Sequence, residues 1–153
     1  MSKSLTFDTG VVEYDVNGAA TVRFNPTDIG FTERLYDAFT SLDARQDEFQ
    51  RRIDEIGDDG PEMFAYAKER DAEMRGIIDG LLGEGVSDAL FADMNCYALA
   101  DGMPIWINLM FAIAEEVRDS FTAEQRKADP RMRKFDDKNA ELLAKYRKAT
   151  TKR

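Results

Sequence analysis

Residues 103–117, MPIWINLMFAIAEEV, decide the fold, because as a helix this stretch is apolar on nearly every face. Large apolar side chains in such number belong in the interior of a soluble protein. Pro104 suits the first position of a helix, where its missing N–H costs nothing. The apolar run ends at Glu115, short of the roughly 20 residues that cross a bilayer. The stretch therefore predicts a buried central helix with amphipathic helices around it.

Two β-favouring runs come before the predicted helices. Residues 11–16 and 20–24 alternate apolar with polar side chains, and Asn17-Gly18 lies between them. Asn-Gly between such runs is the strongest short hairpin signal. Each run has one apolar face, and two strands alone are marginal in water. We therefore expect a β-hairpin at about residues 11–24 that lies on the helical body.

Apolar residues at helical spacing predict the helices on the N-terminal side of the central one. Asn25 followed by proline predicts a helix start. The stripe over residues 35–56 predicts one long helix, although the polar Arg45 and Gln46 interrupt it midway. A second stripe over residues 63–82 predicts a helix that pairs antiparallel with the first.

The remaining helices are indicated by their end signals. Three glycines near residue 83 end the second helix, and a short third helix is expected from Ser87. Thr122 and Gln125 form a capping-box pattern, which predicts that a new helix begins after the central one. Pro130 interrupts or kinks that helix.

These patterns together predict a mainly α protein with a small N-terminal β-hairpin, arranged as a helical bundle around a buried central helix. A chain of 153 residues fits one domain with a single core. We expect a single α-rich domain over residues 1–130, followed by a basic C-terminal helix and a frayed tail over residues 131–153.

The absence of histidine limits the chemistry that this chain can perform. It removes the usual acid/base group near neutral pH and the commonest ligand of zinc. The single cysteine, Cys96, has no basic neighbour in sequence and is interpreted as a half-buried structural thiol. The N-terminal residues lack the apolar core of a signal peptide, so cytosolic synthesis is expected.

Acidic and glycine-rich stretches offer no recognisable site. The loop at residues 57–61 does not place the ligands of an EF-hand, and the glycines at 80–85 do not have P-loop spacing. The adjacent Glu115 and Glu116 point about 100° apart on a helix and cannot act together on one atom. We predict no catalytic residues, no cofactor and no metal, and an enzyme is the least favoured class.

The charge is distributed unevenly along the chain. The net charge is −9, yet residues 131–153 carry nine basic and three acidic side chains, against 12 and 27 in residues 1–130. An acidic body repels nucleic acid and leaves the basic tail as its one possible contact. Docking on another protein, or self-association through tail and body, fits this balance better.

A thin apolar stripe runs along the predicted C-terminal helix, amid charged residues. It consists of Phe135, Leu142, Leu143 and Tyr146. The stripe either docks loosely on its own domain or forms the surface offered to a partner. We treat these four residues as the candidate partner-binding site.

With these landmarks in place, the chain resembles the tail assembly chaperones of long-tailed bacteriophages and prophages. The likeness covers roughly residues 11–117 and leaves the basic tail outside. It is carried by YDVNG (14–18), VRFNPTD (22–28), FTERL (31–35), residues 81–93 and the helix that follows to Val117.

The resemblance implies a small, mostly helical, non-enzymatic protein of the bacterial cytoplasm that is absent from the mature virion. Proteins of this family bind the tape measure protein, help recruit tail tube subunits and tend to form homo-oligomers. Two alternatives stay open: a structural component of the phage tail or head, and a cytosolic adaptor or regulator that docks through its basic C-terminal helix.

Overall fold

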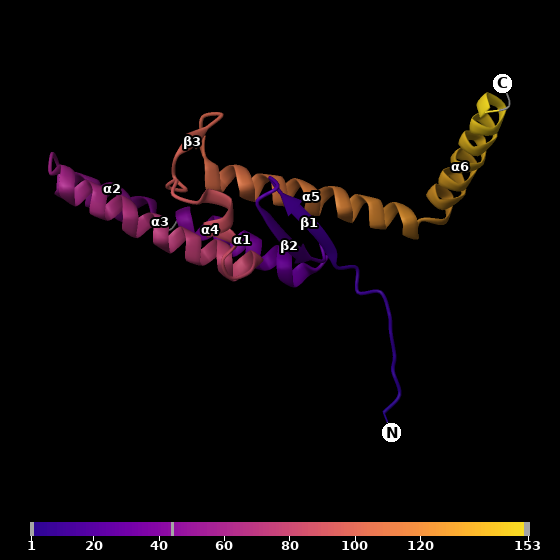
Figure 1. The fold of residues 1–153 in the computed structure, drawn as a ribbon, viewed down its shortest axis with the longest axis horizontal. Helices are drawn as coiled ribbons and strands as arrows, with labels where there is room; N and C mark the ends of the chain where they lie inside the picture. The colour runs from indigo at the N-terminus through magenta and orange to yellow at the C-terminus, as the bar shows by residue number, and fades with distance from the viewer. Residues whose placement is uncertain (1, 44, 152–153) are drawn as a thin grey trace. The chain divides into compact units, whose positions relative to one another are not determined.

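The computed structural model describes residues 2–43 and 45–151, except for the side chains of residues 42, 43, 132, 133, 135, 136, 139 and 146–151. It is mainly helical with a small N-terminal hairpin (Figure 1), which confirms the predicted fold class. The chain forms two compact units, Met1–Val117 and Arg118–Arg153. The elements in order are β1 (Val12–Val16), β2 (Ala20–Phe24), α1 (Ile29–Asp43), α2 (Gln46–Ile56), α3 (Gly60–Leu82), α4 (Val86–Phe91), β3 (Leu99–Ala100), β4 (Met103–Pro104), α5 (Ile105–Ala128) and α6 (Pro130–Thr151).

Strands β1 and β2 form the predicted hairpin, with Val12 paired to Phe24 and Val16 paired to Ala20. The turn needs two residues with positive φ, and Asn17 (φ 55°) and Gly18 (φ 67°) provide them. The amide of Gly18 also donates a hydrogen bond of 3.0 Å to Oδ1 of Asp15. Local turn chemistry alone therefore closes the hairpin.

The hairpin lies on the helical body, as its one apolar face predicts. Val22 and Phe24 of β2 are buried, and β2 packs on α3 and α4. The rings of Tyr14, Phe24 and Phe31 are stacked in series, with centroids 4.6 and 4.3 Å apart. The hydroxyl of Tyr14 donates a hydrogen bond of 2.9 Å to Oε1 of Glu116, so β1 is tied to α5.

The first helix begins at Ile29, so the predicted start at Asn25 is wrong. Oδ1 of Asn25 instead accepts a hydrogen bond of 2.8 Å from the amide of Thr27, which makes a local turn. The carboxylate of Asp28 caps the helix by accepting 2.9 Å from the amide of Gly30. A short polar side chain can bond its own turn as readily as a helix start, and sequence alone does not separate these uses.

The predicted long helix over residues 35–56 is in fact two helices, because α1 ends at Asp43 and α2 begins at Gln46. The break falls at the polar residues that interrupt the apolar stripe. Helix α2 has no buried residue, so no core contact holds it in line with α1. Continuity of a helix depends on such packing more than on propensity.

Helix α3 returns antiparallel to α1 and α2 in Figure 1, as predicted. Its N-cap is Asp59, whose side chain accepts a hydrogen bond of 3.1 Å from the amide of Glu62. Gly83 ends α3 with a φ of 130°, a conformation that side chains resist. The short helix α4 follows at Val86, one residue before the predicted start.

Helix α5 provides the core of the first unit. Its buried residues are one turn apart and are Trp106, Met110, Ile113 and Val117. The helix starts later than predicted, since Pro104 lies in strand β4 and the amide of Ile105 donates 2.8 Å to the carbonyl of Ala98. Phe111 also differs from expectation, because it is 52% exposed. The buried face is therefore one stripe rather than the whole circumference.

The predicted helix start at Thr122 is wrong, because α5 continues through it to Ala128. The hydroxyl of Thr122 donates a hydrogen bond of 3.1 Å to the carbonyl of Arg118, one turn back, which suits a mid-helix threonine. Pro130 does interrupt the helix, as predicted, and opens α6.

We predict that Met110→Ala will lower the free energy of unfolding by about 2–5 kcal/mol, because Met110 is fully buried and its loss leaves a cavity. The neighbouring Phe111→Ala should cost about 1 kcal/mol, since half of that side chain is already in water. Urea denaturation of both variants measures the difference. Equal losses would show that α5 is buried on both faces.

Candidate functional site

Two of the four residues predicted to bind a partner have described side chains. Leu142 is 64% and Leu143 is 58% exposed on α6, next to the exposed and charged Glu141 and Lys145. We call Leu142 and Leu143 the α6 leucine pair. The side chains of Phe135 and Tyr146 lie outside the described residues, so their part in the stripe stays a prediction.

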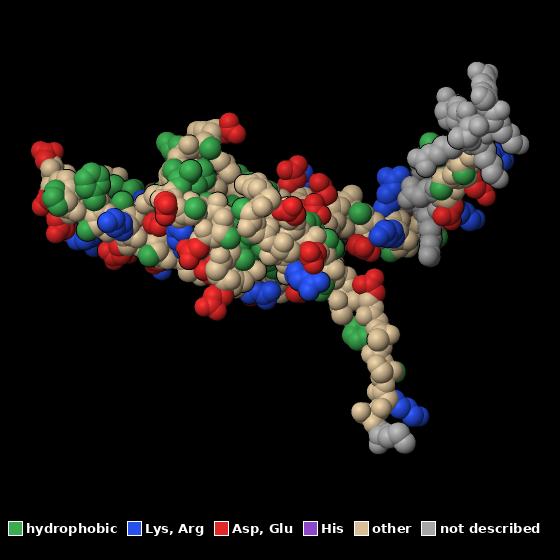
Figure 2. Space-filling view, in the orientation of Figure 1, with side chains coloured by type: hydrophobic (Ala, Val, Ile, Leu, Met, Phe, Trp, Pro, Cys, Tyr) green, Lys and Arg blue, Asp and Glu red, His purple; other side chains and the backbone are tan. Residues whose placement is uncertain are grey.

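Further apolar side chains are exposed on the first unit, and Figure 2 shows some of them gathered over the β3–β4 hairpin. Phe111 of α5 stacks on Phe39 of α1 at 5.8 Å, and Tyr36 of α1 is also exposed. Their sequence signal is the same apolar stripe that elsewhere marks the core, so the pattern could not separate the two. Other exposed apolar residues of this unit are Phe64, Met94 and Leu99.

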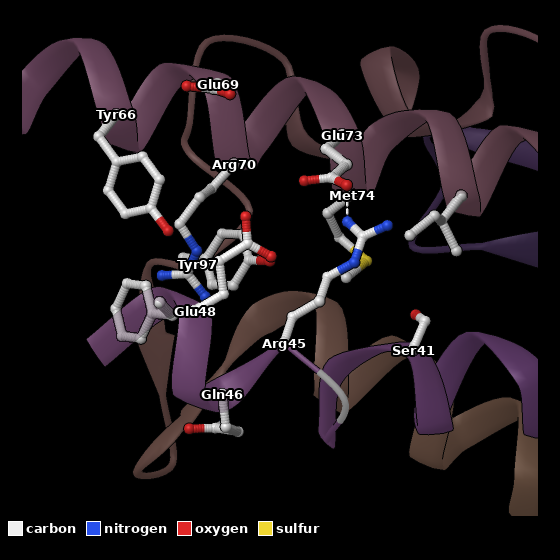
Figure 3. A pocket seen from close by; sticks show the side chains of 12 residues that line it. Ser41, Arg45, Gln46, Glu48, Tyr66, Glu69, Arg70, Glu73, Met74 and Tyr97 are labelled. Carbon is white, nitrogen blue, oxygen red and sulfur yellow. Dashed lines mark ion pairs between the residues drawn. The ribbon is translucent and has the colours of Figure 1, made fainter. Parts of the chain in front are cut away.

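A cleft of about 280 Å³ lies beside α2 and is drawn in Figure 3. Sequence reasoning did not find it, because its walls come from α1, α2, α3 and the loop before β3. Its aromatic residues are Phe49, Tyr66 and Tyr97. Its charged residues are Arg45, Glu48, Glu69, Arg70 and Glu73.

The guanidinium of Arg70 fills the aromatic part of this cleft. It lies 3.6 Å from the centroid of the Phe49 ring on one side and 4.0 Å from that of Tyr97 on the other. Tyr66 extends the cluster, since its ring stacks on Phe49 at 6.0 Å and has Arg52 above it at 5.2 Å. Burial raises the pKa of Tyr97 above its ordinary value, although the charge of Arg70 acts against this.

This cation between two rings is a clamp on α2. Cation–π contacts with a partly desolvated guanidinium are worth about 1–2 kcal/mol each. The ion pair between Arg45 and Glu73, dashed in Figure 3, joins the start of α2 to α3 as well. Since α2 has no buried residue, these contacts replace the apolar core that would otherwise hold it. The cleft is thus occupied by the protein's own side chain and supports a structural role.

Arg75 makes a second polar cluster, at the junction of α3, α4 and the loop before β3. Its guanidinium donates to carboxylate oxygens of Asp71 at 3.0 Å and of Asp88 at 2.8 Å. It also donates to the backbone carbonyls of Ala92 at 2.9 Å and Met94 at 2.7 Å. One side chain of 15% exposure therefore holds three segments together.

Asp71 continues this cluster to Cys96. Its Oδ1 accepts a hydrogen bond of 2.8 Å from the amide of Cys96. Burial alone would raise the pKa of Asp71, but the hydrogen bonds from Cys96 and Arg75 outweigh it and hold this pKa below its usual value. Burial, reinforced by Asp71, raises the pKa of the Cys96 thiol to about 12. Cys96 is fully buried, and a thiol in this state is not a nucleophile.

The part of the chain that the structure describes contains no group of three or more cysteine, aspartate or glutamate side chains that could hold a metal ion. In the same part, none of the helices combines the length and the apolar content that crossing a membrane requires. The surface features that bear on function are therefore the exposed apolar residues and the α6 leucine pair.

We predict that Arg75→Lys will lower the free energy of unfolding by about 3 kcal/mol or more, because an ammonium group cannot reach four acceptors and leaves buried ones unpaired. The matched control is Arg23→Lys, which alters an exposed ion pair with Glu13 and should cost under about 1 kcal/mol. Thermal and urea denaturation compare the two variants. Similar costs would show that the Arg75 cluster is not a structural junction.

We predict that the Cys96 thiol will react with a thiol reagent at least about a hundredfold more slowly in the native protein than in urea at pH 8. A thiol with a pKa of about 12 is almost entirely protonated there, whereas an unfolded cysteine is partly ionised. Raising the pH from 7 to 9 should leave the native reaction slow, since this range lies below the raised pKa. Rapid native labelling at pH 8 would contradict this environment.

Comparison of the chain with protein-family models, with curated proteins and with solved structures found no match. The resemblance to tail assembly chaperones rests on the sequence landmarks alone. Function is accordingly inferred from the surface chemistry of the described residues.

Proposed function

We propose that this protein is a non-enzymatic assembly chaperone of the phage tail type, which binds apolar helical segments of the tape measure protein and helps recruit tail tube subunits. The observation that supports the proposal best is the α6 leucine pair, two large apolar side chains that stand exposed on a charged helix. Exposed apolar residues of this size on one helix are typical of surfaces that bind another protein.

The surroundings of the pair favour a helical partner with acidic residues. Leu142 and Leu143 lie on the predicted stripe with Phe135 and Tyr146, at the one-turn spacing with which an amphipathic helix meets another. Exposed Lys138 and Lys145 flank the pair and would attract acidic side chains. Apolar contact would then supply the affinity, and charge would supply orientation.

The exposed apolar side chains of the first unit support the same function. A protein that shields long apolar helices from aggregation needs adaptable apolar surface, and aromatic and methionine side chains are suited to it. Phe64, Met94, Leu99 and Phe111 provide such surface on four segments of the unit. From the resemblance we also propose action as a homo-oligomer in the bacterial cytoplasm and absence from the mature virion.

We predict that the double variant Leu142→Ser, Leu143→Ser will bind the co-expressed tape measure protein of the same phage at least about tenfold more weakly. The pair is exposed, so the thermal midpoint should change little. The matched control is Glu141→Ser on the same helix, which should retain binding. Affinity capture followed by quantitative titration measures both.

Unchanged binding by the double variant would remove α6 as the contact, and a fall of many degrees in its thermal midpoint would show that the pair is core. Mass spectrometry of purified virions separates the proposed chaperone from the alternative of a structural tail or head component, which would be present in the particle. Capture of an unrelated cytosolic protein through α6, without the tape measure protein, would favour the adaptor alternative.

A further inference from the structure

Residues 3–8, KSLTFD, form an exposed segment ahead of the hairpin, with a strand-like sequence but no strand partner in the described chain. Leu5 is 93% and Phe7 is 82% exposed. These two residues alternate with Ser4, Thr6 and Asp8, so an extended chain would have one apolar and one polar face. Apolar side chains this exposed are costly in water unless a surface covers them.

The chain around Gly10 directs this segment away from its own hairpin. The carbonyl of Thr9 accepts a hydrogen bond of 2.8 Å from Nδ2 of Asn25, the residue that follows β2. Gly10 has a φ of 72°, and a Cβ there would lie 2.7 Å from the same Nδ2 atom, so glycine is required. In Figure 1 the segment extends from the hairpin into solvent. Folding back on β1 would break the bond to Asn25.

Strand β1 is the open edge of the hairpin. It pairs with β2 on one side, and the described part of the chain provides no strand for its other side. An open edge presents backbone donors and acceptors in the spacing of a further strand. On the face toward α5, Val12 is exposed and stands two residues before Tyr14, the same spacing as Leu5 and Phe7.

We propose that residues 3–8 of one copy add as a third, antiparallel strand to the edge of β1 in a second copy. The register that joins the apolar faces places Phe7 beside Val12 and Leu5 beside Tyr14. The polar faces then place Thr6 beside Glu13 and Ser4 beside Asp15. Backbone hydrogen bonds provide the affinity, and the apolar pairs fix the register.

Charge favours this segment over a second β1 as the added strand. Two β1 edges paired with each other would bring the acidic Glu13 and Asp15 of both copies together, and like charges across strands repel. The donated segment instead offers the neutral Ser4 and Thr6 to these carboxylates. The acidic residues of β1 thus exclude edge-to-edge pairing while accepting a neutral strand.

Donor and acceptor are different surfaces of the same chain, so the contact is heterologous. It closes when two copies exchange segments, and otherwise it continues from copy to copy. This assembly does not depend on the proposed chaperone function, since it uses neither the α6 leucine pair nor a second protein. It can therefore hold if that function is wrong, and fail if that function is right.

Cysteine cross-linking tests the register in the full chain. One batch carries Thr6→Cys and the other Glu13→Cys, while the buried Cys96 stays in place. Mixed under oxidising conditions, they should form a disulfide-linked dimer at least about tenfold faster than Thr6→Cys mixed with Lys68→Cys, an exposed control on α3. A yield no greater than the control would overturn the proposal.

A chain that carries both Thr6→Cys and Glu13→Cys decides between donation and folding back. Donation gives linked dimers and higher species at high concentration, whereas a disulfide formed within single chains would overturn the proposal. Sedimentation of wild type and of the Leu5→Asp, Phe7→Asp variant gives a second measurement. The variant should associate at least about tenfold more weakly with an unchanged thermal midpoint, because both side chains are exposed in the single copy. Equal association of variant and wild type, or a wild type that stays monomeric at every concentration, would refute donation.

Discussion

The Arg75 guanidinium is the interaction on which the first unit depends most. It lies among two carboxylates and two backbone carbonyls, and so joins α3 to α4 and to the loop that leads into β3. Through Asp71 the same cluster holds the amide of Cys96, whose carbonyl accepts from the first turn of α5. The central helix is thereby placed relative to α3 by hydrogen bonds, before its apolar stripe contributes. A planar, always charged group suits this position because it satisfies several acceptors at once.

Apolar burial and polar clamping hold different parts of the same unit. The stripe from Trp106 to Val117 and the stacked rings of Tyr14, Phe24 and Phe31 fix the hairpin and α5 to a shared core. Helix α2 has no place in that core and is held by Arg70 between two rings. The cleft beside α2 therefore looks like a ligand site in outline, yet its best cation position is filled from within. A role in protein contact fits the molecule better, because its exposed apolar residues are spread over several segments.

Much of the candidate site could be anticipated, but not its exposure. The pattern of α6 identified Leu142 and Leu143 as a thin apolar stripe amid charge, and both are exposed in the structure. The same kind of pattern also marked Phe111 and Phe64, which were expected in the core. A stripe records that one face is apolar, while the presence of a covering element depends on distant parts of the chain. The Arg70 cleft had no sequence signal at all, since its walls come from four separate segments.

The sequence by itself determined the hairpin, the stops at Gly83 and Pro130, and the helical stripes, because turn geometry, proline sterics and apolar periodicity act over a few residues. Only the tertiary structure decided which polar residues cap a helix, where α1 ends and α2 begins, and that one face of α5 meets water. Asn25, Thr122 and Arg45 each fit two local conformations of similar free energy, and contacts with distant segments select between them. Local rules therefore predicted the elements of this fold, and long-range packing fixed their boundaries and the exposure of its functional surface.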